Sequence, residues 1–155
     1  MNRPARLLAT WFGAGYLPIA PGTWGSLGAL PLAYLLAWAA GGWGLLAGAM
    51  AVFAAGLWAT AAILRPGGLK DPGDVVIDEV AGQLLTLVPV AYDLGWWPLG
   101  FLLFRAADIV KPWPASAAER LPGALGVMAD DAIAGLYAAL ALWGLLWLWS
   151  WAFGG

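Results

Sequence analysis

The sequence predicts an all-α, polytopic membrane protein: a compact bundle with about three to five membrane-embedded helices and short cytoplasmic loops. Three observations support this prediction. Hydrophobic residues make up 63% of the chain and charged residues only 10%, against roughly 25% charged residues in ordinary globular chains. Most of the charged side chains fall in two short polar segments, 65–79 and 105–131. The stretches outside them approach or exceed the roughly 20 apolar residues that a helix needs to cross a bilayer.

The composition also excludes several classes of protein. The 155 residues predict a single domain, 1–155, since domains average about 150 residues. So apolar a chain argues against a soluble enzyme and a disordered protein, and the net charge of -2 argues against nucleic-acid binding. Cysteine and histidine are both absent. Thiolate metal sites, cysteine nucleophiles and phosphohistidine intermediates are therefore excluded.

The first part of the chain is predicted to form an interfacial helix and a membrane hairpin. Prolines and glycines interrupt the apolar stretch that begins at residue 5, which favours a short surface helix over 5–16 rather than a cleaved signal. Residues 25–40 and 43–64 contain no charged side chain. The Gly41-Gly42 pair between them is typical of a tight turn.

Residues 80–104 leave two alternatives open. They form either one span with Asp93 buried in it or a short helical hairpin that turns at 92–95. With hairpins both here and in 25–64, every Lys and Arg faces one side of the membrane, which the positive-inside rule identifies as the cytoplasm. We therefore favour the hairpin, although its 13-residue first arm rises only about 20 Å. Both polar segments are then expected on the cytoplasmic face.

The last predicted span, 132–153, is uncharged and ends in a tryptophan cluster typical of a membrane interface. Asp130 and Asp131 stand directly before it. One of them is explained as an N-terminal helix cap. Two adjacent carboxylates at a low-dielectric boundary repel one another unless a cation neutralises them. The pair therefore indicates a functional site.

The first polar segment contains two kinds of carboxylate. Asp71, which precedes a proline, and Asp74 match the capping pattern of a helix start. Asp78 and Glu79 lie beyond that predicted first turn and lead into an apolar run, where a carboxylate is costly. We therefore expect at least one of Asp78 and Glu79 to be functional.

The second polar segment combines cations with a carboxylate. Arg105, Asp108 and Lys111 are spaced three residues apart, so they share one face of a helix that Pro112 and Pro114 should end. The pattern is consistent with structural ion pairs at a membrane boundary. It is equally consistent with two cations that flank a catalytic carboxylate.

Two hydroxyls follow a Pro-Gly turn near the N-terminus, Thr23 and Ser26. They are interpreted either as a hydroxyl cap at a helix start or as part of a phosphate cradle at a helix N-terminus.

An oxygen-only set of ligands is predicted for the acidic residues near these helix ends, because no histidine or thiolate accompanies them. Such ligands suit hard cations such as Mg²⁺ or Mn²⁺. Mg²⁺ usually takes one or two carboxylates together with a substrate phosphate. Acidic residues beside Arg105 and Lys111 therefore suggest phosphate-ester chemistry at the membrane surface.

Four motifs together resemble the phosphatidylglycerophosphatase A family over nearly the whole chain. They are Pro21-Gly-Thr-Trp-Gly-Ser26, Asp71-Pro-Gly-Asp-Val-Val-Ile-Asp78-Glu79, Phe104-Arg105-Ala-Ala-Asp108-Ile-Val-Lys111-Pro112-Trp113-Pro114 and Gly126-Val-Met-Ala-Asp130-Asp131-Ala-Ile-Ala-Gly135. The resemblance implies Mg²⁺-dependent hydrolysis of phosphatidylglycerophosphate to phosphatidylglycerol and inorganic phosphate. It further implies a multi-pass protein of the bacterial cytoplasmic membrane whose active site faces the cytoplasm and whose partners are a phospholipid substrate and the membrane.

Roles for the residues follow from this resemblance as a hypothesis. Asp78, Glu79, Asp130 and Asp131 would hold one or two Mg²⁺ ions. Asp108 would be a further ligand or the base that orients the attacking water.

Three further residues are assigned to the substrate on the same basis. Arg105 and Lys111 would neutralise the phosphate monoester. Thr23 would donate a hydrogen bond to a phosphate oxygen or contact the glycerol. The alternative is a membrane transporter for an ion or small solute, since intramembrane carboxylates often mark ion paths. A nucleotide-dependent phosphatidyltransferase would need an Asp-Gly-x-x-Ala-Arg signature, which the chain lacks.

Overall fold

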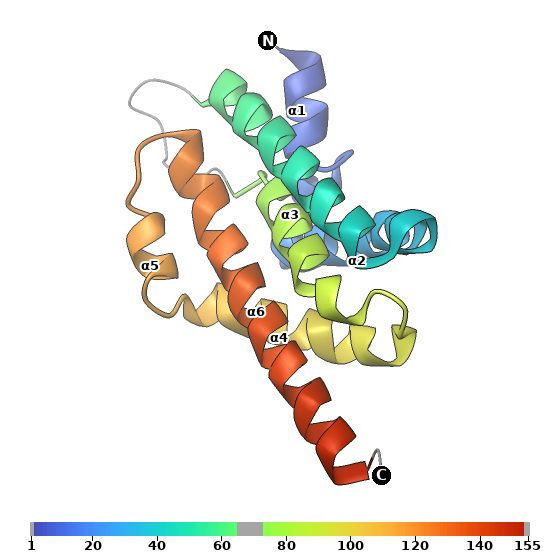
Figure 1. Ribbon diagram of the computed structural model, residues 1–155. Helices are drawn as coiled ribbons and strands as arrows, with labels where there is room; N and C mark the ends of the chain where they lie inside the picture. The colour runs from blue at the N-terminus through green and yellow to red at the C-terminus, as the bar shows by residue number, and fades with distance from the viewer. Residues whose placement is uncertain (1, 65–72, 154–155) are drawn as a thin grey trace.

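The computed structural model describes residues 2–64 and 73–153, and in this part of the chain helices are joined by turns and loops, without a β-strand. The predicted all-α class is therefore confirmed (Figure 1). The elements in order are α1 (Arg3–Ala9), η1 (Ala14–Tyr16), α2 (Pro21–Ile63), α3 (Ile77–Thr86), η2 (Val88–Val90), η3 (Leu94–Trp96), α4 (Trp97–Val110), α5 (Ala115–Ala118) and α6 (Ala124–Phe153).

α2 consists of two arms that fold back on one another. The backbone leaves helical geometry at Ala40 and Gly41, and the φ of +58° at Gly41 is one that glycine adopts without strain. A Cβ at Gly48 would clash with Leu36, so the second arm packs closely on the first. The predicted turn at Gly41-Gly42 is confirmed. The first arm begins earlier than predicted, at Pro21, since proline suits the first position of a helix.

α3 and α4 form a second hairpin. Gly82 packs against Phe104, and Gly100 packs against Leu87, so the two helices run antiparallel. Asp93 is exposed in the connecting turn, where its carboxylate accepts a hydrogen bond of 3.1 Å from the backbone N–H two residues on. Residues 80–104 are therefore not one helix with a buried carboxylate, and the favoured hairpin geometry is confirmed.

α3 lies at the centre of the bundle. It packs against both arms of α2 and against α6, and α4 crosses α6 at a steep angle (Figure 1). Eight of the ten residues of α3 are buried. A residue of this short helix is therefore surrounded by other helices, which allows several elements to contribute to one site at its N-terminal end.

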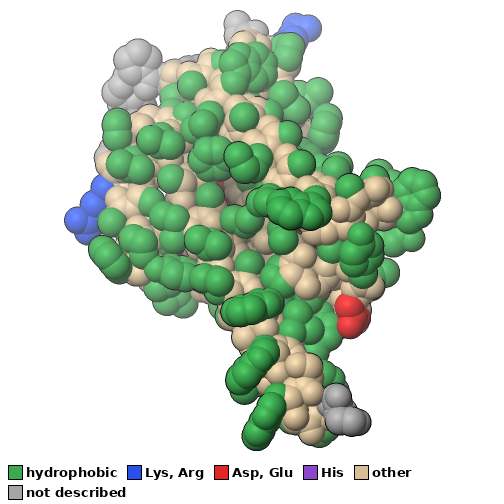
Figure 2. All heavy atoms as spheres, in the orientation of Figure 1, with side chains coloured by type: hydrophobic (Ala, Val, Ile, Leu, Met, Phe, Trp, Pro, Cys, Tyr) green, Lys and Arg blue, Asp and Glu red, His purple; other side chains and the backbone are tan. Residues whose placement is uncertain are grey.

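The surface of the molecule is compatible with a membrane. α2 and α6 are long and apolar enough to cross one, and hydrophobic side chains cover most of the face seen in Figure 2. The last part of α6 extends beyond the bundle and exposes Trp147 and Trp151 (Figure 1). The number of crossings and the cytoplasmic position of the polar loops stay predictions.

The N-terminal helix is shorter than the predicted 5–16. α1 ends at Ala9, and the chain then turns through the left-handed region at Trp11 and Phe12. The Trp11 indole N–H donates a hydrogen bond of 3.1 Å to the carbonyl oxygen of Gly28 in α2. This long-range contact fixes the turn, which the local sequence alone does not indicate.

Candidate functional site

Four carboxylates from three helices gather at the N-terminal end of α3. Asp78 and Glu79 come from α3, Asp108 from α4 and Asp131 from α6; we call these four residues the acidic cluster. Carboxylate oxygens of Asp78, Glu79 and Asp131 lie within 4.8 Å of one another. Asp108 joins them through Arg105, whose guanidinium contacts the Asp108 carboxylate and lies beside Glu79. All but Glu79 are at most 9% exposed.

A close crossing of α3 and α6 brings the cluster together. A Cβ at Gly135 would lie 2.9 Å from the Cα of Gly82, and a Cβ at Gly82 would lie 2.6 Å from the backbone oxygen of Asp131. Only glycine leaves room for this approach. Asp78 and Glu79 lie about one helical turn before Gly82, and Asp131 lies one turn before Gly135. The crossing therefore sets the carboxylates of the two helices side by side.

The start of α3 differs from the prediction. α3 begins at Ile77, so Asp74 is not its cap but lies before it and pairs with Arg6 at 3.7 Å. The predicted cap Asp71 lies outside the described residues. The N–H of Val76 donates a hydrogen bond of 2.9 Å to the carbonyl oxygen of Ala9, the last residue of α1. This bond keeps the residues before Ile77 out of α3. The two α3 carboxylates thus occupy its first turn, where negative charge is favoured.

The two adjacent aspartates of α6 have different partners. α6 begins at Ala124, so Asp130 and Asp131 lie in its second turn and neither is the predicted cap. Asp130 accepts a hydrogen bond from Lys111 Nζ at 2.8 Å and therefore stands apart from the three converging carboxylates. Three of the four predicted metal ligands come together, and the fourth is paired with a lysine. Whether any of them binds a metal stays a prediction.

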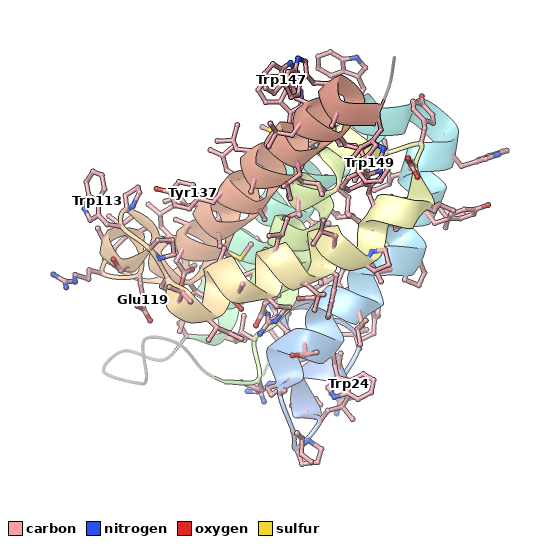
Figure 3. The ribbon with its side chains drawn as sticks, turned by 90° about the horizontal axis from the view of Figure 1, so that it is seen from below. Trp24, Trp113, Glu119, Tyr137, Trp147 and Trp149 are labelled. Atoms are coloured by element: carbon pink, nitrogen blue, oxygen red, sulfur yellow. The ribbon has the colours of Figure 1, made fainter. Side chains whose placement is uncertain are left out.

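Lys111 bridges two acidic side chains at the end of α4. Its Nζ lies 2.8 Å from Asp130 and 3.1 Å from Glu119. Burial alone would lower the pKa of Lys111, but the hydrogen bonds and charges of Asp130 and Glu119 raise it above its ordinary value. The ammonium group therefore stays charged and is held by this end of α6. Figure 3 shows Glu119 at this end of the molecule, away from Trp147 and Trp149.

Arg105 joins the acidic cluster to the start of α2. Its Nη1 lies 2.6 Å from Oδ2 of Asp108, as the helical spacing predicts, and donates to Oγ of Ser26 at 3.4 Å. A Cβ at Gly22 would clash with the Glu79 carboxylate and lie 3.2 Å from Nη1 of Arg105. The first turn of α2 therefore forms one wall of the site.

The two hydroxyls near the start of α2, Thr23 and Ser26, are not helix caps. The N-cap of α2 is Ala20, which makes no side-chain capping bond. Ser26 is fully buried and its Oγ donates to the carbonyl oxygen of Gly22 at 3.0 Å. Thr23 is half-buried, and its contact with substrate stays a prediction. Ser26, one of the two hydroxyls predicted to form a cap or a phosphate cradle, instead lies against Arg105, and its spacing from Gly22 places both on one helix face.

Buried polar atoms next to the cluster have no hydrogen-bond partner among the described residues. They are Oε2 of Glu79, Nε of Arg105 and both amide atoms of Gln83. Gln83 is fully buried and follows Glu79 by one helical turn. Each such unpaired group costs about 1–3 kcal/mol. No sequence pattern indicates Gln83, because an uncharged side chain at the edge of an apolar run gives no signal of its own.

The donor set fits a hard divalent cation. Three carboxylates converge within 4.8 Å, and the chain contains neither histidine nor cysteine. An unpaired oxygen of Glu79 is buried at the same place. Oxygen ligands of this kind suit Mg²⁺ or Mn²⁺. A cation there would offset the repulsion between the carboxylates.

Comparison with known proteins identifies the family of the chain. The family model described as phosphatidylglycerophosphatase A matches residues 7–146. Phosphatidylglycerophosphatase A of Escherichia coli is 37% identical over 90% of this chain and 81% of its own length. The Haemophilus influenzae protein of the same name is 35% identical over 92% and 88%. A Bacteroides thetaiotaomicron protein named "Putative phosphatidylinositol-3-phosphatase" is 38% identical over 92% and 98%. No solved structure matches.

Proposed function

The chain belongs to the phosphatidylglycerophosphatase A family, and we propose that it hydrolyses phosphatidylglycerophosphate to phosphatidylglycerol and inorganic phosphate in a Mg²⁺-dependent reaction. Family membership makes it a phosphatase that acts on a phosphate monoester. The observation that supports the proposal most strongly is the meeting of Asp78, Glu79 and Asp131 within 4.8 Å.

The three converging carboxylates are the proposed ligands of the cation. When bound there, Mg²⁺ would lower the pKa of a bound water and stabilise charge on the phosphoryl oxygens. Asp130 would not bind the cation itself, because its carboxylate is bonded to Lys111. It would instead help to position its neighbour Asp131. Its Oδ1 accepts a hydrogen bond of 3.0 Å from the N–H of Asp131, which helps to fix the position of that ligand.

Arg105 and Asp108 are the proposed partners of the reacting groups. Arg105 lies against Glu79 and is a charged donor for the phosphate dianion. Asp108, held at 2.6 Å by Arg105, is placed to bind the cation or to accept the proton of the attacking water. The water oxygen forms the new bond to phosphorus, the bond from phosphorus to the glycerol oxygen breaks, and that oxygen gains a proton.

Direct contact with the phosphate is less well supported for Lys111 and Thr23 than for Arg105. Lys111 is already bonded to two carboxylates, so we assign it a positioning role on α6 rather than direct contact with substrate. Thr23 lies in the first turn of α2, next to the residue that contacts Glu79 and Arg105. A phosphate held by Arg105 would therefore lie near the N–H groups of that turn, which favour anions.

The proposed setting is the cytoplasmic face of a bacterial cytoplasmic membrane. The apolar surface and the two long apolar helices support a position in the bilayer. The positive-inside rule supports the cytoplasmic side for the end that holds Arg105 and Lys111. In this setting the lipid tails stay in the bilayer and only the headgroup enters the site.

The transporter alternative is less consistent with the positions of the charges. Within 2–64 and 73–153, the acidic cluster lies at one end of the bundle, and Asp93 is exposed in the turn at the other end of the α3–α4 hairpin. Ionisable groups that mark an ion path would be expected between these two ends. The described core between them contains Leu84 and Leu87 and the uncharged polar residues Gln83 and Thr86 but no charged side chain, which favours an enzyme.

A phosphate-release assay tests the proposal. The purified protein is given phosphatidylglycerophosphate in detergent micelles without nucleotide, with Mg²⁺ or with a chelator. We expect release with Mg²⁺, loss with chelator and recovery when excess Mg²⁺ is added. Release that persists in chelator would contradict metal dependence. Release from phosphatidylinositol 3-phosphate alone would show that the headgroup assignment is wrong.

A further inference from the structure

An apolar groove runs along α3 between the second arm of α2 and α6. Its volume is about 290 Å³. Its walls include Leu46, Met50 and Phe53 of α2, Ala81 and Leu85 of α3, and Ala132 of α6. Figure 1 shows the two walls on either side of α3. Every residue that lines it is apolar, so the groove is suited to hydrocarbon rather than to a polar ligand.

The groove begins at the level of the acidic cluster. Asp78, Ala81 and Leu85 are spaced i, i+3 and i+7, so they share one face of α3. The spacing from Asp78 to Leu85 is about 10 Å along the helix axis. On α6, Ala132 directly follows the cluster residue Asp131. The nearest wall residues of the groove, Ala81 and Ala132, therefore lie within about one helical turn of cluster residues.

The groove continues toward the opposite end of the α3–α4 hairpin. The second arm of α2 contacts the start of α3 through Gly56 and Ile77, and its beginning contacts η2, just after α3, through Gly42 and Val88. Residues 46–53 lie between these two contacts. In the proposed membrane setting, the groove thus runs from the headgroup level into the bilayer.

We propose that this groove holds one acyl chain of the lipid whose phosphate is hydrolysed at the acidic cluster. The inference rests on the proposed function and deepens it, because it names the part of the substrate that the protein recognises outside the headgroup. A volume of about 290 Å³ lies at the lower end of the range for small-molecule sites. It suits one chain rather than a whole diacyl lipid. A protein that recognises the acyl chain rather than the headgroup could bind lipids that differ in headgroup but share the phosphatidyl part.

Filling the groove should separate long-chain from short-chain substrates. We would replace Met50, which is 66% exposed and tolerates a larger side chain, by tryptophan. For dioleoyl phosphatidylglycerophosphate, kcat/KM should fall about tenfold, mostly through KM. For the dihexanoyl lipid, whose chains are too short to fill the groove, it should change by less than about twofold. Leu46→Trp provides an independent second variant.

The matched control is Ala51→Trp. Ala51 is exposed on the same arm of α2 but does not line the groove. This variant should show the wild-type kcat/KM on both the long-chain and the short-chain lipid. An equal loss on both lipids in Met50→Trp and Leu46→Trp, or no loss on the long-chain lipid, would overturn the proposal.

Photolabelling tests the groove without turnover. The probe is a phosphatidic acid with a diazirine at the middle of one acyl chain, in nanodiscs of dioleoylphosphatidylcholine. Adducts should concentrate in residues 46–53 and 81–85 and disappear with excess unlabelled phosphatidylglycerophosphate. Adducts spread over all exposed faces, or unaffected by competition, would overturn the proposal. Absence of phosphate release with localised labelling would instead contradict only the proposed function.

Discussion

Carboxylates lie in opposite environments at the two ends of the α3–α4 hairpin. At the turn end, Asp93 is exposed and caps the short helix that follows it. At the other end, Asp78, Asp108 and Asp131 are buried among apolar helices, with Glu79 beside them. A structural carboxylate needs only one N–H donor and contact with water. Burying several together is costly without a cation, so the difference supports the acidic end as the proposed site of the chemistry.

The same two ends are also held together differently. The acidic end depends on the glycine crossing of Gly82 and Gly135, where no side chain separates the backbones. The turn end is held by larger groups, such as Trp96 and Trp149, whose rings meet edge to face at 6.1 Å. Tight backbone packing gives the acidic end a fixed geometry, and bulky apolar packing gives the turn end stability. Changes at the two ends should therefore affect different properties.

The largest expected effect is the loss of activity in Asp131→Asn. The amide keeps the size of the side chain but removes a charged ligand, so phosphate release should fall by at least about 100-fold. Thermal unfolding should not move to lower temperature, because the change also relieves repulsion in the cluster. Asp93→Asn at the opposite end is the control and should keep wild-type activity. Near-normal release by Asp131→Asn would contradict its role as a ligand.

The next largest effect is expected for Arg105. Arg105→Met removes a donor for phosphate and leaves Asp108 without its 2.6 Å partner, so kcat/KM should fall by about 10–100-fold. Arg105→Lys keeps the charge but not the planar guanidinium, and should restore only part of the activity. Steady-state kinetics on both variants would measure this. Full activity in Arg105→Lys would mean that charge alone suffices.

Lys111 should affect stability more than chemistry. Lys111→Met leaves the buried carboxylate of Asp130 unpaired and should lower the free energy of unfolding by about 2–4 kcal/mol. Glu119→Gln removes the more exposed partner and should cost about 0–1 kcal/mol. Because the pKa of Lys111 is raised in the folded protein, its contribution is present at neutral pH and is lost only as pH rises above the ordinary range of lysine. Denaturant unfolding in detergent, followed against pH, tests both statements.

The smallest effect is expected at the turn end. Asp93→Ala removes one capping hydrogen bond and should lower stability by about 1 kcal/mol. Phosphate release should stay within about twofold of wild type, because typical surface changes act locally. A large loss of activity in this variant would mean that the two ends are coupled, and would weaken the contrast between them.

Sequence patterns predicted both turns and most of the site. The charge-free stretches and Gly41-Gly42 predicted the first hairpin, and the positive-inside rule favoured the turn at Asp93. Carboxylates at the edges of apolar runs stood out because the chain has so few charges, which indicated the pairs Asp78 and Glu79, and Asp130 and Asp131, without distinguishing the members of either pair. These features depend on composition and local spacing, which the sequence contains directly.

The features that sequence patterns missed depend on long-range contacts. α3 starts at Ile77 because Val76 is bonded to the end of α1, and no local pattern encodes that bond. Asp130 and Asp131 look equivalent in sequence, yet only Asp130 forms an ion pair with Lys111 at the end of α4. The contact of Ser26 with Arg105 likewise depends on how α4 packs against the start of α2.

Direct measurement of cation binding tests the central claim most sharply. Mn²⁺ is titrated into the purified protein in detergent and followed by electron paramagnetic resonance, with Mg²⁺ as competitor. Wild type and Asp93→Asn should bind Mn²⁺ saturably and release it to Mg²⁺, whereas the double variant Asp78→Asn/Asp131→Asn should not bind it. Equal binding by the double variant and the wild type would contradict a cation site formed by α3 and α6.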